Sequence, residues 1–265
     1  MFASTSVASG ASCYGQPATK VGNAHDNTIH GTSGDDVIVA KGGNDDVHGR
    51  GGNDYICGGP GRDIVDGDSG DDWALGGGDG NDKVLGGGGR EARMAGDNLT
   101  VSGKATGGGD DVIDAETGGY GLVLGDSLSE NGSARGGGDD EIDGGETNGM
   151  GYLVGDSVAS GKATGGGNDV IRGTPAFDPM IGDSFSFAGD ASGRGSDRLF
   201  GEGDSDSLYG DNYAPSGTTS GGGRDTLKAG HGDDDLDGGP RRDVCDGDGG
   251  NADTAVHCEQ TTGVP

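Results

Sequence analysis

Apolar residues, proline and basic residues are all scarce in this sequence. Hydrophobic residues make up 29% of the chain, which is too little for the core of an ordinary globular domain of this length. Glycine supplies 65 of the 265 residues, but it does not recur at every third position and proline supplies only 7, so a collagen triple helix is excluded. No apolar run approaches the roughly 18 residues that a membrane-spanning helix needs. The sequence therefore predicts neither a conventional core nor a membrane span.

The chain has 17 basic residues against 46 acidic residues, and its formal net charge is −29. A charge of this sign repels nucleic acid and anionic membranes, and it attracts cations. Low hydrophobicity combined with a high net charge is also typical of disordered chains. We therefore expect the chain to fold only if something neutralises much of this charge.

The cysteines and the N-terminus both indicate an oxidising compartment. The four cysteines contain no Cys-x-x-Cys pair, which favours two disulfides over a zinc site. The first twelve residues lack the apolar centre of an intact signal peptide, but their small residues are consistent with the remnant of a processed one. The sequence therefore predicts a secreted protein.

A nine-residue unit recurs along the chain and is clearest in residues 49–57 and 58–66. Each unit begins with a glycine-rich turn, has Asp at position six and has an apolar, usually β-branched, residue at position eight. A fixed period of this kind indicates a solenoid. We expect each unit to form a turn and a strand of three or four residues with one apolar side chain pointing inward, and two units to complete one coil. From residue 22 we count about nineteen units, hence nine or ten coils rising about 4.8 Å each.

The middle of the chain follows a longer repeat. Its position-six aspartates are spaced by 29, 29, 28 and 28 residues. Each long unit contains a Gly-Asp pair, then nine or ten inserted residues, then a glycine-rich run that leads to the position-six Asp. Because alternate units occupy opposite edges of the coil, all five insertions should project from one edge. The Gly-Asp aspartates are Asp97, Asp126, Asp156, Asp183 and Asp211.

The repeats predict an all-β, parallel solenoid, and the changes in repeat length divide the chain into five parts. Residues 1–21 form a leader and N-terminal cap, and residues 22–94 form a regular roll. Residues 95–228 form a roll with repeats of about 29 residues and looped-out insertions. Residues 229–246 return to the regular repeat, and residues 247–265 form a C-terminal cap.

The nine-residue units resemble the hemolysin-type, or repeats-in-toxin (RTX), family, whose pattern is Gly-Gly-x-Gly-x-Asp-x-apolar-x, and the resemblance covers about residues 22–246. It implies a parallel β-roll with calcium ions between successive coils. The chemistry agrees, because Ca²⁺ takes six to eight oxygen ligands and glycine-rich turns expose carbonyls. The simpler alternative is that these aspartates merely cap turns. However, the large number of aspartates in register favours the interpretation that they are ligands, for roughly ten to fifteen calcium ions. By this resemblance the ligands are Asp36, Asp45, Asp54, Asp63, Asp72, Asp82, Asp111, Asp140, Asp169, Asp197, Asp206, Asp225, Asp234 and Asp243.

One motif suggests an enzyme but is explained better by the repeat. Residues 125–128 spell Gly-Asp-Ser-Leu, the nucleophile block of a class of esterases. However, Gly-Asp-Ser also begins the ordinary unit at residue 67, and the Asp-x-x-His partner is missing because Asp253 and His257 have the wrong spacing. We therefore predict no catalytic residues.

The cysteines allow three pairings. We favour a bond between Cys13 and Cys57 and another between Cys245 and Cys258, because each would fasten one end of the solenoid and solenoids need capped ends.

The leading prediction is a secreted, non-catalytic calcium-binding protein of the stand-alone type that resembles actinobacterial members of the family. Folding is predicted to depend on the bound ions. One alternative is an adhesion or surface-assembly protein whose insertions contact a cell surface or another protein. The other is the calcium-dependent tail of a secreted enzyme or toxin.

Overall fold

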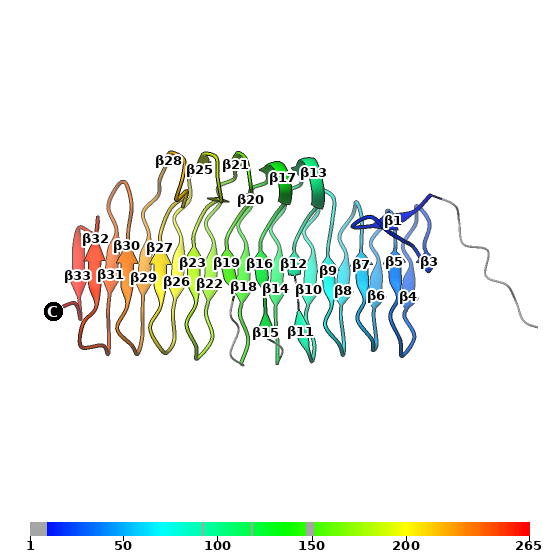
Figure 1. Cartoon of the computed structure of the whole chain (residues 1–265), viewed down its shortest axis with the longest axis horizontal. Helices are drawn as coiled ribbons and strands as arrows, with labels where there is room; N and C mark the ends of the chain where they lie inside the picture. Colours follow the sequence, from blue (N-terminus) through cyan, green and yellow to red (C-terminus); the bar gives the residue numbers. More distant parts are fainter. Residues whose placement is uncertain (1–9, 92, 118, 147–150) are drawn as a thin grey trace, which may run out of the picture.

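The computed structural model shows an all-β solenoid and describes residues 10–91, 93–117, 119–146 and 151–265 (Figure 1). Two parallel sheets of eleven strands each run along its length. No helix in these described ranges is long and apolar enough to cross a membrane. The predicted parallel β-roll is thus confirmed, while residues 1–9 of the predicted leader lie outside the described residues.

Each coil contributes one strand to each of the two sheets, which we name sheet I and sheet II. Sheet I consists of β3 (Lys20–Val21), β5 (Val37–Val39), β7 (Tyr55–Cys57), β9 (Trp73–Leu75), β12 (Arg93–Ala95), β16 (Leu122–Leu124), β19 (Tyr152–Val154), β23 (Pro179–Ile181), β27 (Ser207–Tyr209), β30 (Asp235–Asp237) and β32 (Thr254–Val256). Sheet II consists of β4 (Thr28–His30), β6 (Asp46–His48), β8 (Ile64–Asp66), β10 (Lys83–Leu85), β14 (Val112–Asp114), β18 (Glu141–Asp143), β22 (Val170–Arg172), β26 (Arg198–Phe200), β29 (Thr226–Lys228), β31 (Val244–Asp246) and β33 (Gln260–Thr262).

The position-eight residues form the core between the two sheets. Each is the middle residue of a three-residue strand, so it points inward while its two neighbours point outward. Ile56 of sheet I and Val65 of sheet II are both 0% exposed, and the same column continues to Leu236 and Cys245. Strands pair residue for residue with the next coil, as Ile56 does with Ala74. This register stacks equivalent positions of every unit on one another.

The roll extends into both regions that the sequence predicted as caps. Strand β3 lies within the predicted leader, and β32 and β33 lie within the predicted C-terminal cap. These additions explain why each sheet has eleven strands where nine or ten coils were expected. These end strands keep the residue-for-residue pairing of the roll, as β32 does with β30.

The five insertions leave one edge of the roll, as predicted, but they are not separate loops. They pair in parallel into a third sheet, which we name sheet III (Figure 1). It consists of β13 (Leu99–Thr106), β17 (Leu128–Arg135), β20 (Val158–Ala159), β21 (Ala163–Thr164), β24 (Phe185–Ser186), β25 (Ala191–Gly193) and β28 (Thr219–Gly221). We call the edge where the chain passes from sheet I through sheet III to sheet II the insertion edge. The opposite edge is the plain edge, where β11 (Arg90–Glu91) pairs with β15 (Gly119–Tyr120).

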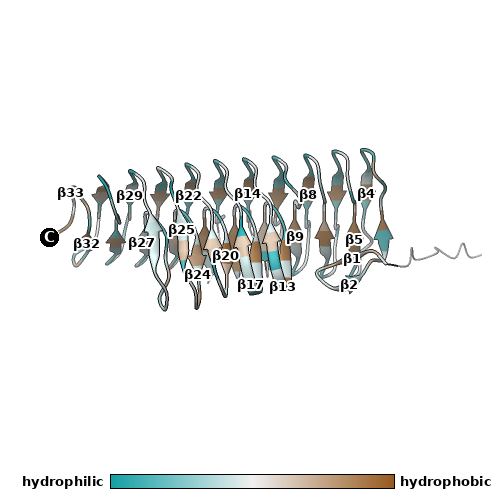
Figure 2. Cartoon of the chain, turned by 90° about the horizontal axis from the view of Figure 1, so that it is seen from above, coloured by the Kyte–Doolittle hydropathy of each residue, from teal (hydrophilic) through white to brown (hydrophobic). Residues whose placement is uncertain are grey.

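Sheet III packs on the outer face of sheet I and encloses a second apolar core. Leu124 and Val154 of sheet I contact the cluster that contains Val158 and Phe185 of sheet III. The short hairpin of β1 (Ser12–Cys13) and β2 (Gln16–Pro17) lies on the same side of the roll (Figure 2). The position-nine residues of sheet I are apolar in this region, which is the sequence signal for a covered face.

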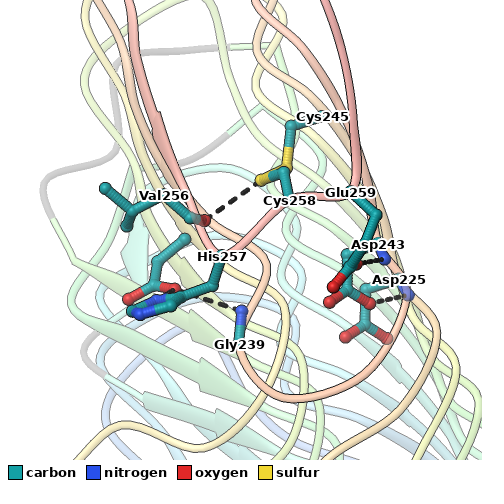
Figure 3. Close-up of a disulfide and its surroundings, with 9 residues drawn as sticks. Asp225, Gly239, Asp243, Cys245, Val256, His257, Cys258 and Glu259 are labelled. Carbon is teal, nitrogen blue, oxygen red and sulfur yellow. Dashed lines mark hydrogen bonds and ion pairs between the residues drawn. A yellow bond between two sulfur atoms is a disulfide. The ribbon is translucent and has the colours of Figure 1, made fainter.

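Both predicted disulfides are present. Cys13 of the hairpin bonds to Cys57 of sheet I, with their Cα atoms 5.8 Å apart. Cys245, in the core of sheet II, bonds to Cys258 between the last two strands (Figure 3). Each bond therefore fastens a terminal segment to the stack, which is what an open solenoid end requires.

Candidate metal centre

The position-six carboxylates form two columns, one along each edge of the roll. Within a column, the backbone N–H of one position-six residue donates to the Oδ1 atom of the aspartate in the next coil. The N–H of Asp54 donates to Asp72 over 2.8 Å on the plain edge, and the N–H of Asp63 donates to Asp82 over 2.7 Å on the insertion edge. These repeated bonds fix the orientation of each carboxylate and leave only its second oxygen free.

That second oxygen, Oδ2, is buried and has no hydrogen-bond partner in every predicted ligand except Asp36. Buried polar atoms in folded proteins nearly always have a partner. A whole column of exceptions indicates a missing ligand that binds oxygen. The unpartnered Oδ2 atoms belong to Asp45, Asp54, Asp63, Asp72, Asp82, Asp111, Asp140, Asp169, Asp197, Asp206, Asp225, Asp234 and Asp243.

In most units the first residue is a glycine, which completes the cradle around this oxygen. A Cβ atom built on Gly67 would lie 2.6 Å from the carbonyl oxygen of Gly86 and 2.8 Å from Oδ2 of Asp72. The carboxylate oxygen of Asp72, in the same unit, and the carbonyl oxygen of Gly86, in the next coil, therefore border the same small space. Both are hard oxygen donors of the kind that Ca²⁺ prefers, so the residues fit a calcium ion.

Burial makes these carboxylates costly to ionise when no cation is bound. Burial raises the pKa of Asp72 to about 7 and that of Asp82 to about 8, opposed in part by the backbone hydrogen bonds. The pKa of Asp206 is raised by burial to about 9. A bound cation would reverse these shifts because it favours the charged form.

Asp36 differs from the other predicted ligands because both of its oxygens have partners. Thr32 donates its N–H and its hydroxyl to Oδ2, over 2.5 and 2.9 Å, and Lys20 forms an ion pair with the same oxygen at 3.2 Å. Thr19 donates to Oδ1. Although burial opposes it, these bonds hold the pKa of Asp36 below its ordinary value. Asp36 is therefore satisfied without a metal ion.

The middle of the plain edge is poor in free carboxylates. Tyr120 occupies position six there, is fully buried and donates its hydroxyl to Asp178. The other oxygen of Asp178 accepts the N–H and hydroxyl of Thr174, so Asp178 repeats the arrangement of Asp36. The unit between Tyr120 and Asp178 on this edge includes residues 147–150, which lie outside the described residues.

Two further acidic residues occupy column positions that the sequence pattern did not assign. Glu91 replaces Asp at position six, and both of its oxygens are buried without partners. Burial raises the pKa of Glu91 to about 7. Asp253, directly before β32, accepts the N–H of Asp234 over 3.0 Å and leaves its Oδ2 unpartnered. A carboxyl residue directly before a strand is the signal that would have found Asp253, whereas Glu91 lies two residues before β12.

Glu259 ends the insertion-edge column beside the disulfide of Cys245 and Cys258. Its carboxylate accepts the N–H of Asp243 over 2.7 Å, as a position-six aspartate of a further coil would do (Figure 3). The column therefore closes on a side chain that the C-terminal disulfide holds in place.

The aspartates of the Gly-Asp pairs are not among the predicted ligands, but they too are buried. Asp97, Asp126 and Asp156 are all fully buried, and neither oxygen of any of them has a partner. The serines that follow in the Gly-Asp-Ser motifs, such as Ser127 and Ser157, are 0% exposed. A buried hydroxyl of this kind is closed to a substrate, which agrees with reading the motif as a copied unit start.

We predict that Gly67→Ala weakens calcium-dependent stability, because the added methyl group would occupy the cradle beside Asp72. Overpacking of this kind costs about 1–3 kcal/mol. Gly34→Ala is the matched control, since nothing lies within 4 Å of a Cβ atom at Gly34. Thermal unfolding at one fixed calcium concentration measures both. Equal melting temperatures for the two variants would contradict the cradle.

A family model described as the RTX calcium-binding nonapeptide repeat matches residues 21–56, 40–74, 58–90, 191–212 and 219–252. Searches of curated proteins and of solved structures gave no match.

Proposed function

Because this chain carries RTX calcium-binding nonapeptide repeats, we propose that it is a secreted, non-catalytic protein that folds on binding many calcium ions between the coils of its β-roll. The observation that carries the proposal is the two columns of buried Oδ2 atoms without partners, many of them beside a backbone carbonyl of the next coil, as Asp72 is beside that of Gly86. Calcium binds to this combination of one carboxylate and several carbonyls. The two disulfides support an extracellular location, where they persist.

The proposed calcium set differs from the sequence prediction at three positions. Asp36 is left out because its oxygens are already bonded. Glu91 and Asp253 are added because each leaves buried carboxyl oxygens unpartnered in a column. That a partner binds through the insertions stays a prediction. We expect such a partner to contact the outer face of sheet III, at exposed residues such as Ser102 and Lys104.

Native mass spectrometry across a calcium titration tests the proposal. We expect the wild-type protein to bind many ions and Asp72→Asn to bind at least one fewer, because the variant loses a charged ligand. Asp36→Asn is the matched control from the same column, and it should keep the wild-type count. A wild-type protein that binds no calcium, or an Asp72→Asn variant that keeps the full count, would refute it.

A further inference from the structure

Beside the position-six column of the insertion edge lies a second file of carboxylates, formed by the Gly-Asp pairs that precede each insertion. Carboxyl oxygens of Asp97, Asp111 and Asp126 all lie within 4.8 Å of one another, and so do those of Asp126, Asp140 and Asp156. Asp126 belongs to both groups. The arrangement therefore repeats from coil to coil with one shared member.

These carboxylates are buried and have no ion-pair partner among the described residues. Asp126 and Asp156 are 0% exposed, and none of their four carboxyl oxygens has a hydrogen-bond partner. None of the ion pairs in the described part of the chain involves them. The hydroxyls of Ser127 and Ser157, next in sequence, are also buried without partners. An unpaired charge in such a place is very unfavourable unless a cation shares it.

The glycine run after each insertion closes this space. A Cβ atom on Gly136 would lie 2.5 Å from Cγ of Asp126 and 2.5 Å from the carbonyl oxygen of Gly107. A Cβ atom on Gly107 would meet Asp97 in the same way. Glycine thus brings backbone carbonyls directly against the carboxylates, as it does in the regular units.

We propose that Asp97, Asp111 and Asp126 hold one calcium ion, and that Asp126, Asp140 and Asp156 hold another, in two carboxylate-rich sites joined by Asp126. The proposal rests on the proposed calcium function and extends it to a set of ligands outside the nonapeptide pattern. Each site offers three carboxylates, whereas a regular unit offers one carboxylate with carbonyls. Because the affinity of calcium sites rises with ligand charge, these two sites fill first as calcium increases. The middle of the roll is then the part that orders at the lowest calcium concentration.

At its C-terminal end the file is partly satisfied by protein groups. Asn212 donates to Oδ2 of Asp183 over 3.1 Å, and the N–H of Gly223 donates to Oδ1 of Asp211 over 2.8 Å. The two proposed sites are therefore confined to the first three Gly-Asp aspartates, where every oxygen is free.

Native mass spectrometry of Asp126→Asn during a calcium titration tests the two sites. We expect this variant to lose two ions, and to lose those that bind at the lowest calcium concentration, because Asp126 serves both sites. Asp36→Asn is again the control, because both carboxyl oxygens of Asp36 already have protein partners. It should keep the wild-type count. A wild-type count and a wild-type first binding step in Asp126→Asn would overturn the proposal.

Two further variants keep the test decisive if Asp126→Asn does not fold at saturating calcium. Asp97→Asn and Asp156→Asn each belong to one site only, so each should lose one early-binding ion. Retention of all ions by both variants would overturn the proposal. Failure of this proposal can be distinguished from failure of the proposed calcium function. If only the two carboxylate-rich sites are wrong, Asp72→Asn still loses an ion. If the calcium function is wrong, the wild-type protein binds no calcium.

Discussion

A chelator should unfold this protein at neutral pH, and added calcium should restore it. Neighbouring carboxylates in one column are about 4.8 Å apart along the stack. At an effective dielectric constant of about 20, each ionised pair repels by roughly 3 kcal/mol. A few such pairs equal the 5–15 kcal/mol by which a typical protein is stable. The roll without calcium therefore cannot keep its columns ionised and stay folded, so we expect loss of most of the β-sheet circular dichroism signal.

The experiment needs two controls that separate calcium binding from simple screening. Magnesium should not restore the fold, because it requires a near-octahedral shell and retains its waters. Sodium chloride at about 1 M should also fail, since salt screens buried charges poorly. Both disulfides must remain oxidised throughout, so that only the metal changes. The same circular dichroism spectrum in chelator and in millimolar calcium would show that the columns do not depend on metal ions.

The two sheets and their core could be predicted because the repeat is strict. Position eight is apolar in nearly every unit, and Ile56 and Val65 lie in the core as that pattern requires. Position-six residues such as Asp72 stack because the register between coils is residue for residue. The sequence pattern is sufficient at these positions because each depends only on its own unit and on an identical neighbour.

Sheet III could be predicted only in part, because its strands depend on one another more than on their own sequences. The insertions contain glycines such as Gly103 and Gly132, which weaken a strand pattern, and yet these two glycines are paired partners in the sheet. The signal for a covering layer was in sheet I, where position nine is apolar at residues such as Leu124 and Val154, whereas most strands of sheet II end in a polar residue. A face that is apolar in only one of the two sheets implies a covering layer.

The ligand set shows a second limit of the repeat pattern. Asp36 stands at position six as the pattern requires, but Thr32 replaces the glycine of position two and donates two hydrogen bonds to the carboxylate oxygen that would otherwise face a cation. Glu91 departs from the pattern but reaches the same position in the column without any partner. The decisive property is the number of protein donors to each carboxylate, and that number depends on residues four positions away or in the next coil.

Acid should weaken calcium binding and stabilise the calcium-free roll. Burial raises the pKa of Asp63 to about 7 and those of Asp82 and Asp225 to about 8. In the unfolded chain these groups titrate near pH 4. Between about pH 4 and pH 8 the folded calcium-free state therefore holds more protons than the unfolded state, and its stability falls as the pH rises. That contribution is fully present below about pH 4 and is lost as the pH passes the folded pKa values.

Calcium must displace these protons, so binding should release them and the calcium midpoint should rise as the pH falls. For each proton displaced, affinity changes by about tenfold per pH unit over this window. Titrations at pH 8 and pH 5.5, followed by circular dichroism, measure the shift, and a chelated sample brought from pH 8 to pH 4.5 should regain β-sheet signal. A saturating calcium sample at both values serves as the control for acid denaturation. A calcium midpoint that does not change with pH would show that the buried carboxylates are already ionised before calcium binds. That result would contradict the prediction.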